Sequence, residues 1–253
     1  MDLLLSNKRV LVTGSSRGIG YYIAKAFLSA GAKVMITGRD QESLKDAEKT
    51  LGEIGEVISY NGDMSSSTEI ALALKVLEEK FGGVDVVVAN VGDGSAGGIE
   101  ISQEEWQTAL QTNFVGAMVL VAKTTPLLIR QKGNIIFISS IAGVESIGAS
   151  LPYGASKAAL LSAMKGLAHE LGSKGIRVNA IAPGNIFFPG GRWDRKLAER
   201  KEYFENYIKS EVPLRRFGTP EEIANVALFL ASPLSSFTTG ACFVVDGGQT
   251  KSF

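Results

Sequence analysis

The chain has 253 residues, with 26 lysines and arginines against 26 aspartates and glutamates, one histidine and one cysteine. A single cysteine cannot close an internal disulfide, and one cysteine with one histidine cannot supply a zinc site made from those residues. Zero net charge argues against a nucleic-acid partner, which needs a basic surface. We therefore expect no metal and no nucleic acid, and chemistry performed by other side chains or by a bound cofactor.

Short apolar runs alternate along the chain with longer amphipathic stretches. The runs predict seven strands, at residues 9–13, 33–37, 56–60, 84–89, 134–139, 177–181 and 242–245. The amphipathic stretches predict helices at about 18–30, 41–52, 66–81, 104–131, 153–172 and 220–231. Continuous apolar runs are typical of strands buried on both faces of a parallel sheet. The alternation predicts an α/β fold of the Rossmann type, a doubly wound, seven-stranded parallel sheet with helices on both faces, in a single domain of residues 1–253.

No uninterrupted apolar run reaches the roughly 20 residues of a membrane span. The longest, residues 114–122, ends at Lys123. The first residues contain an early acid, only three consecutive leucines and no small-residue cleavage site, which is untypical of a signal peptide. We expect a cytoplasmic protein with no membrane partner.

A long segment interrupts the alternation after the sixth predicted strand. Residues 183–210 begin with two prolines and three glycines and continue as a charged helix. In a doubly wound sheet such a segment lies at the carboxyl end of a strand, where ligands bind. A purely exposed loop would rarely carry Phe187, Phe188 and Trp193 together, so we expect a substrate lid at about 184–212. The alternative is a surface excursion without function.

A glycine-rich segment, residues 13–20, follows the first predicted strand and opens the first predicted helix with the spacing G-x-x-x-G-x-G. Gly14 permits a tight turn, Gly18 lets the main chain approach a pyrophosphate, and Gly20 lets helix and strand pack. Free N–H groups at the start of the helix attract an anion. We therefore expect a dinucleotide here, with contacts from Gly14, Ser16, Arg17, Gly18, Ile19 and Gly20.

The end of the second predicted strand bears on which dinucleotide binds. It has Gly38 and Arg39, without the acid that commonly holds the ribose 2′-hydroxyl of NAD. Arg17 and Arg39 could converge on a 2′-phosphate, which matches guanidinium groups in charge and geometry. We predict NADP(H), with two alternatives open: Arg39 is solvated while Asp40 merely caps the next helix, or Asp40 restores a preference for NAD(H).

Tyr153 and Lys157 are four residues apart in a predicted helix and so share one face. A nearby ammonium group favours the phenolate and lowers the pKa of a tyrosine toward the working range. Such a pair can donate a proton without histidine, although Tyr and Lys at this spacing are usually just a solvated helix face.

These motifs occur together in an order that resembles a known family. The segments that carry the resemblance are residues 13–20, Asn90-Val91-Gly92, Asn113, Ser140, Tyr153-x-x-x-Lys157, Pro183-Gly184 and Asp246-Gly247-Gly248. Over nearly its whole length the chain resembles the short-chain dehydrogenases/reductases, and among them the members similar to 3-oxoacyl-[acyl-carrier-protein] reductases. The resemblance implies an NADP-dependent oxidoreductase that interconverts a ketone and a secondary alcohol.

The resemblance also implies a role for each matching residue. Tyr153 would protonate the carbonyl oxygen, and Lys157 would lower the pKa of Tyr153 and hold the nicotinamide ribose. Ser140 would bind the substrate oxygen, whereas Ser139 would face the other side of its strand. Asn113 would hold a water that links Lys157 to solvent. The implied cofactor contacts beyond the glycine turn are Arg39, Asp63, Met64, Asn90, Gly92, Tyr153, Lys157, Pro183, Gly184 and Ile186.

The chain departs from the family pattern at two places. Residues 89–92 are Ala-Asn-Val-Gly where the family often has Asn-Asn-Ala-Gly, and Phe188 stands where a threonine often binds the carboxamide. Phe188 puts that contact in doubt and makes the predicted pocket more aromatic. His169 would lie about 24 Å along the helix from Tyr153, at 1.5 Å per residue, and is expected to be structural or at the surface. Cys242 is expected to be a small buried apolar residue.

Several side chains bear on the substrate. The apolar side chains favour a 3-oxoacyl thioester or a hydrophobic or aromatic ketone as the substrate. These side chains are Leu151, Phe187, Phe188 and Trp193. Arg192 and Asp194 in the lid keep a sugar or polyol dehydrogenase open. A non-catalytic dinucleotide sensor and an epimerase or dehydratase relative are further alternatives. Small and apolar residues on the helices at 104–131 and 153–172, together with the resemblance, predict a homotetramer, with a dimer next.

Overall fold

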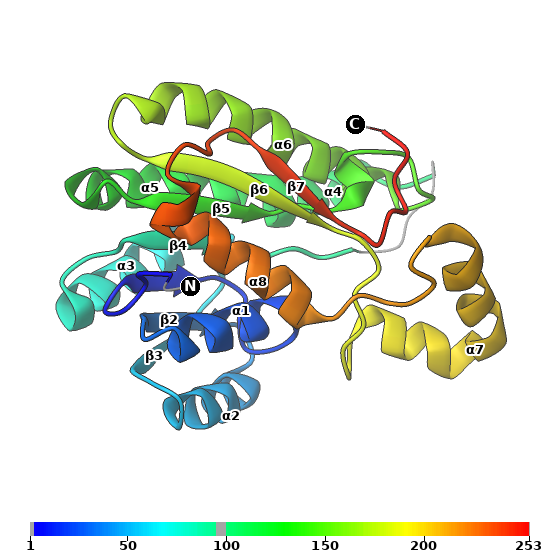
Figure 1. Ribbon diagram of the computed structural model, residues 1–253, viewed down its shortest axis with the longest axis horizontal. Helices are drawn as coiled ribbons and strands as arrows, with labels where there is room; N and C mark the ends of the chain where they lie inside the picture. Colours follow the sequence, from blue (N-terminus) through cyan, green and yellow to red (C-terminus); the bar gives the residue numbers. More distant parts are fainter. Residues whose placement is uncertain (1–2, 95–99, 253) are drawn as a thin grey trace.

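A computed structural model describes residues 3–94 and 100–252 of the chain. Seven strands form one parallel sheet in the order β3-β2-β1-β4-β5-β6-β7 (Figure 1). The strands are β1 (Arg9–Val12), β2 (Lys33–Gly38), β3 (Val57–Asn61), β4 (Val86–Ala89), β5 (Asn134–Ile138), β6 (Arg177–Pro183) and β7 (Cys242–Val245). The strand order reverses between β1 and β4, so a crevice is expected at the carboxyl ends of these two strands.

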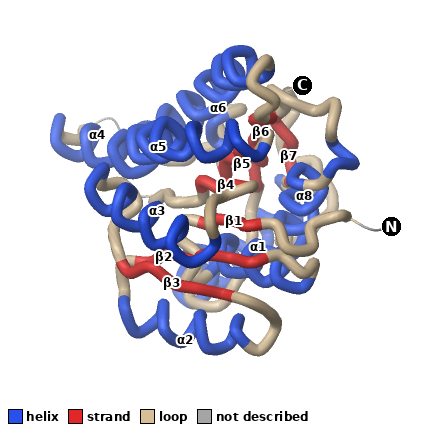
Figure 2. The backbone as a smooth tube through the Cα atoms, turned by 90° about the vertical axis from the view of Figure 1, so that its left-hand side faces the viewer, coloured by secondary structure: helices blue, strands red, loops and turns tan. Residues whose placement is uncertain are grey.

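Helices cover both faces of the sheet (Figures 1 and 2). One face carries α1 (Gly18–Ser29), α2 (Gln41–Gly52) and α8 (Pro220–Ala231). The other carries α3 (Ser67–Phe81), α4 (Gln103–Leu110), α5 (Gly116–Gln131) and α6 (Leu151–Gly172). The remaining helix, α7 (Arg192–Glu211), stands away from the sheet beyond the carboxyl end of β6 (Figure 1).

Each central strand contributes to two apolar cores. Val10 and Val12 of β1 belong to the core that contains Phe27 of α1, whereas Leu11 belongs to the core that contains Leu77 of α3. Successive side chains of a strand point to opposite faces, so a strand covered on both faces needs an uninterrupted apolar run. This explains the continuous runs in the sequence, and the predicted fold class is confirmed.

The predicted strands and helices begin and end within two residues of the observed ones, except in one region. The helix expected at 104–131 is divided, because a π-helical turn, Gln111–Val115, separates α4 from α5. Asn113 lies in this turn and is buried. A π-helical turn holds one residue more than an α-helical turn, so periodicity alone does not reveal it.

The same region holds the most apolar helical stretch of the described chain. Gln103–Gln131 is long and apolar enough to cross a membrane, by length and composition only. It consists of α4, the π-helical turn and α5, which contact α3, α6 and β4. It therefore forms part of the helical layer over the sheet (Figure 2).

Candidate active site

The turn between β1 and α1 is held by main-chain geometry and by one asparagine. Gly14 and Gly18 have φ angles of +61° and +59°, in the left-handed region that favours glycine. Asn90, after β4, donates hydrogen bonds from Nδ2 to the carbonyl oxygens of Thr13 (3.0 Å) and Gly14 (2.9 Å). A Cβ on Gly20 would lie 2.6 Å from that same Nδ2, so only glycine allows this approach.

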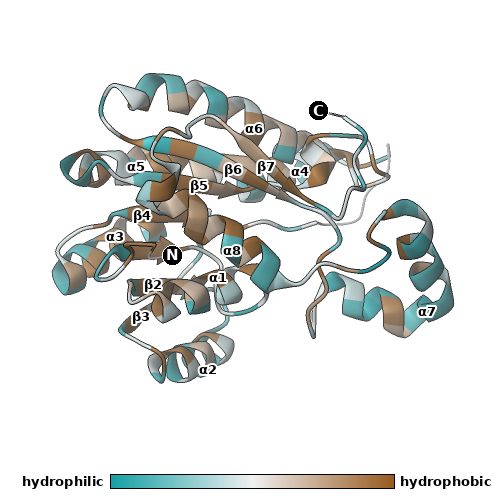
Figure 3. Ribbon diagram, in the orientation of Figure 1, coloured by the Kyte–Doolittle hydropathy of each residue, from teal (hydrophilic) through white to brown (hydrophobic). Residues whose placement is uncertain are grey.

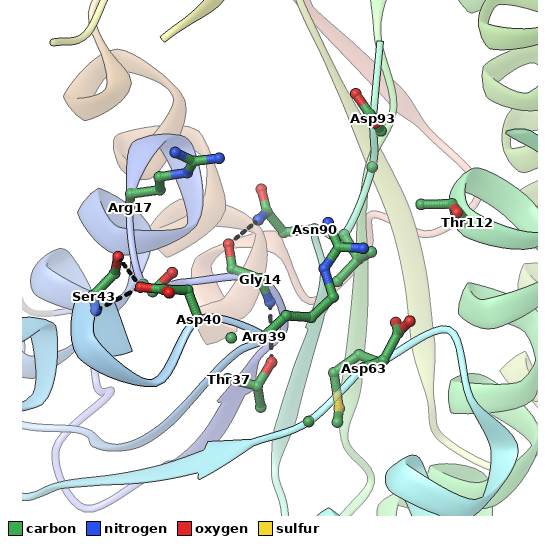
Figure 4. Close-up of a pocket in the computed structure, with 16 residues that line it drawn as sticks. Gly14, Arg17, Thr37, Arg39, Asp40, Ser43, Asp63, Asn90, Asp93 and Thr112 are labelled. Atoms are coloured by element: carbon green, nitrogen blue, oxygen red, sulfur yellow. Dashed lines mark hydrogen bonds between the residues drawn. The ribbon is translucent and has the colours of Figure 1, made fainter. Parts of the chain in front are cut away.

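Two short polar side chains tie the turn to β2. The Ser15 hydroxyl donates to the carbonyl oxygen of Val12 (2.6 Å) and accepts from the N–H of Thr37 (3.1 Å). Thr37 Oγ1 accepts in turn from the N–H of Gly14 (3.1 Å), as Figure 4 shows. Ser15 and Thr37 were not predicted from the sequence. The one signal for them was a hydroxyl residue at the end of a buried strand.

A pocket of about 370 Å³ opens beside this turn, at the reversal of strand order. Eight of the predicted cofactor residues line it: Gly14, Ser16, Arg17, Arg39, Asp63, Met64, Asn90 and Gly92. Eight others are outside its lining: Gly18, Ile19, Gly20, Tyr153, Lys157, Pro183, Gly184 and Ile186. The lining residues that were not predicted are Thr37, Gly38, Asp40, Ser43, Gly62, Val91, Asp93 and Thr112.

The pocket has a cationic end (Figure 4). Neither Arg17 nor Arg39 donates a side-chain hydrogen bond to another residue of the pocket. Asp40 Oδ1 accepts from the N–H of Ser43 (2.8 Å) and caps α2; hydrogen bonds from Ser43, and to a lesser extent the charge of Arg17, lower the pKa of this carboxyl. A Cβ on Gly38 would lie 3.1 Å from Ser16 Oγ, so the end of β2 has little room for an acid.

Ser139 and Ser140 end up on opposite sides of the chain after β5. The Ser139 hydroxyl donates to the carbonyl oxygen of Lys157 (3.0 Å) and fastens α6 to the sheet. Ser140 caps a short 3-10 turn, because its Oγ accepts from the N–H of Ala142 (3.1 Å). The Ser140 side chain also interacts with Tyr153, in the first turn of α6. Ser140 is therefore the serine that shares the site with Tyr153.

Lys157 is buried one helical turn beyond Tyr153. Its Nζ donates to the carbonyl oxygen of Ile138 (2.9 Å) and lies 5.7 Å from the centre of the Tyr153 ring. Burial lowers the pKa of Lys157 to about 8. Burial also raises the pKa of Tyr153, against the opposing effects of Ser140 and Arg192. This direction is opposite to the one expected from the sequence, because burial disfavours the phenolate more strongly than its neighbours favour it.

Asn113 lies next to Lys157 at the inner end of the site. Its Oδ1 accepts from the N–H of Asp93 (2.9 Å), and its Nδ2 donates to the carbonyl oxygens of Asp93 (3.1 Å) and Ala109 (2.9 Å). A Cβ on Gly92 would lie 2.9 Å from both Asn113 Oδ1 and Lys157 Nζ. Gly92 therefore allows these groups to meet, while the Asn113 side chain is used to hold the segment after β4.

Residues 184–212, called the insertion below, begin after β6. A Cβ on Gly18 would lie 2.8 Å from Cζ of Phe188, so this ring packs directly on the glycine turn. Phe188 thus joins the insertion to the predicted pyrophosphate site. Ile186 is buried and forms an isolated parallel bridge with Gly218, while Gly184 lies against the main chain of Asp246.

A small aromatic core holds the insertion together with Phe217, which lies just beyond it. The ring centre of Trp193 lies 5.7 Å from that of Phe204, 5.9 Å from that of Tyr207 and 5.3 Å from that of Phe217. Phe187 also contacts Phe217, at 6.0 Å. Trp193, which the sequence suggested as a substrate contact, therefore packs inside the insertion.

The two singleton residues take no part in this site. His169 is exposed on α6, and Cys242 is partly rather than fully buried, with burial raising its thiol pKa. Within residues 3–94 and 100–252, no group of three or more His, Cys, Asp or Glu side chains could hold a metal ion.

Comparison with known proteins agrees with this geometry. The family profile described as Enoyl-(Acyl carrier protein) reductase matches residues 14–250. The 3-oxoacyl-[acyl-carrier-protein] reductase of Chlamydia muridarum is 39% identical, over 98% of this chain and 100% of that protein. The chain belongs to the short-chain dehydrogenase/reductase family. It is an oxidoreductase of the kind that acts on carbonyl and alcohol groups.

Solved structures of other short-chain dehydrogenases/reductases have the same fold. L-sorbose reductase from Gluconobacter frateurii, complexed with NADPH and L-sorbose, is 32% identical with a TM-score of 0.95, and the match covers 100% of both chains. A 7α-hydroxysteroid dehydrogenase complexed with NADH is 30% identical with a TM-score of 0.92, covering 99% of this chain and 97% of that one. The family binds nicotinamide dinucleotides, and the two neighbours hold different ones.

Proposed function

We propose that this protein uses NADP(H) to interconvert a ketone and a secondary alcohol, with Tyr153 as the acid/base. The observation that carries the proposal is the meeting of Ser140, Tyr153, Lys157 and Asn113 beside the mouth of the dinucleotide pocket. A reduced nicotinamide, when bound, supplies a hydride. Gly14 and Gly92 line the pocket proposed for the cofactor.

The residues of the site have complementary tasks. Ser140 donates to the carbonyl oxygen of the substrate and orients it, and Tyr153 transfers its phenolic proton to that oxygen. Lys157, whose ammonium group is near the ring, stabilises the phenolate that results. Its hydrogen bond to Ile138 fixes the ammonium group in place. Asn113 keeps the segment after β4 against Lys157, and the predicted water contact of Asn113 remains part of the proposal.

The cofactor proposed is NADP(H) rather than NAD(H). Two observations support it: the guanidinium groups of Arg17 and Arg39 are free of hydrogen bonds to the pocket, and the carboxylate of Asp40 caps α2. Gly38 favours the same choice because it provides no carboxylate at the end of β2, and a side chain there would crowd Ser16. Arg39→Ala should raise the KM for NADPH 10- to 100-fold and the KM for NADH less than 3-fold, with Lys45→Ala on exposed α2 as control. A wild type that prefers NADH would refute the assignment.

Tyr153→Phe tests the mechanism. Removing the phenolic proton should lower kcat for ketone reduction by about 10²- to 10⁴-fold, the usual range for a general acid. The Kd for NADPH, measured by fluorescence, should change less than 3-fold. Tyr22→Phe on α1 removes a hydroxyl outside the site and should keep full turnover. If Tyr153→Phe turned over at the wild-type rate, the proposed mechanism would fall. A wild type that binds NADPH but reduces no ketone would instead fit a dinucleotide sensor.

The proposed substrate is a 3-oxoacyl thioester or a hydrophobic or aromatic ketone, which follows the reductases that the chain resembles. A sugar or polyol is the second candidate, favoured by the similarity to a reductase complexed with L-sorbose. A panel of oxoacyl thioesters, ketones, diketones and sugars, followed by NADPH absorbance, separates the two. A rate at least 10-fold above the others would identify the class.

The insertion is proposed to act as a substrate lid on the single domain, since Phe188 joins it to the glycine turn and α7 lies beside the site. We also propose a cytoplasmic homotetramer without membrane or nucleic-acid partners. Exposed apolar side chains support the assembly: Phe237 is fully exposed, and Val244 on edge strand β7 is 41% exposed. Light scattering should give four times the 26.8 kDa mass of the chain.

A further inference from the structure

Arg192 lies beside the proposed acid/base. It is the first residue of α7, and its side chain reaches from the insertion to the segment after β4. A Cβ on Gly94 would lie 2.9 Å from Arg192 Nη1 and 3.9 Å from Tyr153 Cε2, so one point borders both groups. The charge of Arg192 also acts to lower the pKa of Tyr153, although burial outweighs it. A guanidinium group therefore borders the place where a carbonyl must meet Tyr153.

The neighbouring charges of the insertion are already used. Asp194 accepts from the N–H of Gly190 (2.8 Å), and Arg195 donates to the carbonyl oxygen of Gly190 (3.4 Å). The Lys196 ammonium group lies over the Trp193 ring, 4.5 Å from its centre. In the described parts of the chain, no carboxylate lies within 4.0 Å of Arg192 and no hydrogen bond from its side chain is present.

The Arg192 guanidinium group is therefore unpaired at the site, although the charge of Asp93 also acts on Tyr153 and raises its pKa. Arg192 and Lys196 are one helical turn apart, and Lys196 is partly buried. Burial, and then the charge of Arg192, lower the pKa of Lys196. Like charges one turn apart repel each other, so this arrangement favours an anion between the insertion and Tyr153. The rest of α7 is mostly hydrophilic (Figure 3).

We propose that Arg192 binds a carboxylate of the substrate, and that the enzyme reduces short oxo acids to hydroxy acids. This inference rests on the proposed function for its chemical step. The planar guanidinium group matches a carboxylate with two parallel hydrogen bonds and so sets the orientation of the substrate as well as its affinity. Because Arg192 and the Tyr153 ring border one point, the substrate proposed is a short oxo acid, with its carboxylate near its carbonyl.

The reaction balances with the cofactor already proposed. An oxo acid, NADPH and one proton give a hydroxy acid and NADP⁺. The carbonyl carbon gains the hydride and is reduced, the oxygen gains the proton of Tyr153, and the nicotinamide is oxidised. The carboxylate is unchanged, so Arg192 is a specificity-determining residue. The inference keeps the reaction proposed above and replaces its substrate, because a 3-oxoacyl thioester has no anion this near its carbonyl.

Matched substrates test the inference. We would compare 2-, 3- and 4-oxo acids with their methyl esters, which keep the carbonyl but lose the charge. The wild type should prefer at least one acid over its ester by 10-fold or more in kcat/KM. Arg192→Met should remove that preference, lowering kcat/KM for the acid 10- to 100-fold and for the ester less than 3-fold. Arg192→Lys should restore part of it, and Arg195→Met, three residues further along α7, should leave it intact.

The outcomes separate the possible roles of Arg192. Equal activity of acid and ester in the wild type would overturn the inference, and so would an equal loss for both in Arg192→Met, which indicates a lid-positioning role. A raised Kd for NADPH in Arg192→Met would show that the residue binds cofactor phosphate instead, again overturning it. Calorimetry of the oxo acid on Tyr153→Phe with NADPH isolates binding from turnover. Binding that weakens 10-fold or more on adding Arg192→Met upholds the inference even if the proposed function fails.

Discussion

The glycine turn after β1 and the insertion after β6 border the same site, but different groups hold them. Main-chain carbonyls, N–H groups and short polar side chains fix the turn, with Asn90 and Ser15 at distances of 2.6 to 3.1 Å. Aromatic rings around Trp193 hold the insertion, with ring centres 5.3 to 5.9 Å apart. Hydrogen bonds to the main chain have narrow geometric limits, whereas ring packing tolerates adjustment. The turn is therefore suited to bind one constant ligand and the insertion to vary with the substrate.

The largest expected effect is at the turn. Gly20→Ala would place a Cβ 2.6 Å from Asn90 Nδ2 and from the Gly14 carbonyl oxygen. Overpacking of this kind costs about 1–3 kcal/mol of stability, and the displaced turn should bind NADPH at least 100-fold more weakly. Gly166→Ala, at an exposed position of α6, is the control, since a Cβ there would meet no neighbouring element within 4 Å. The Gly166→Ala control should gain up to about 1 kcal/mol of stability, because alanine favours a helix more than glycine does. Chemical denaturation measures the stability of each variant, and cofactor titration measures its affinity for NADPH. Equal values for the two variants would show that the turn tolerates a side chain as well as the open position on α6 does.

Lys157 sharpens the comparison because it too is held by a main-chain carbonyl. Its pKa falls from 10.5 to about 8 on folding, so between these values the unfolded chain binds the proton and the folded chain does not. The stability of the wild type should therefore rise with pH across this window, relative to Lys157→Met, by up to about 3 kcal/mol. Below pH 8 the unfavourable contribution is fully present. Unfolding without cofactor from pH 7 to 10.5 measures the difference, with exposed Lys45→Met as the pH-independent control. If the stabilities of the wild type and Lys157→Met ran parallel across this pH range, burial would not have lowered the pKa of Lys157.

The smallest effect is expected in the insertion. Trp193→Ala removes three ring contacts, each worth about 0.5–1.5 kcal/mol, yet the sheet and its two cores keep their contacts. Unfolding of the whole protein should change by no more than about 2 kcal/mol, because only local packing is lost. The KM of the carbonyl substrate should rise several-fold while that of NADPH changes less than 2-fold. Hydrogen exchange should accelerate within residues 184–212. The control Trp106→Ala, on α4, should not accelerate exchange within residues 184–212. Unchanged exchange in Trp193→Ala would show that the rings around Trp193 do not hold the insertion.

The turn could be predicted from the sequence and the insertion only in outline. Gly14, Gly18 and Gly20 are adjacent in the chain, and their spacing directly specifies local geometry. The partners of Trp193 lie 11 to 24 residues further on, and only the fold brings them together. Helical periodicity correctly placed α7 after the strand, but it could not tell which side chains face Tyr153.

Ser139 and Arg192 differ in how far the sequence predicts their positions. Strand alternation separated Ser139 from Ser140 before any coordinates were needed, because successive side chains point to opposite faces. Arg192 gave no such signal, since its position beside Tyr153 depends on how the insertion folds back over Gly94. The pKa direction of Tyr153 was missed for a related reason, because burial is a property of the whole fold.

The π-helical turn at Gln111–Val115 fixes the number of residues that this region can have. Deleting one residue there would let α4 and α5 join into one regular α-helix, which would be locally more favourable. The residues inside the turn would then face new directions, while α4 and α5 keep their phase, because the turn loses only the residue that it holds in excess of an α-helical turn. Asn113 would turn away from Asp93 and Lys157, and with it the segment after β4 would lose its support. Natural variation at this place should therefore consist of substitutions, with gaps confined to the loops outside Gln103–Gln131.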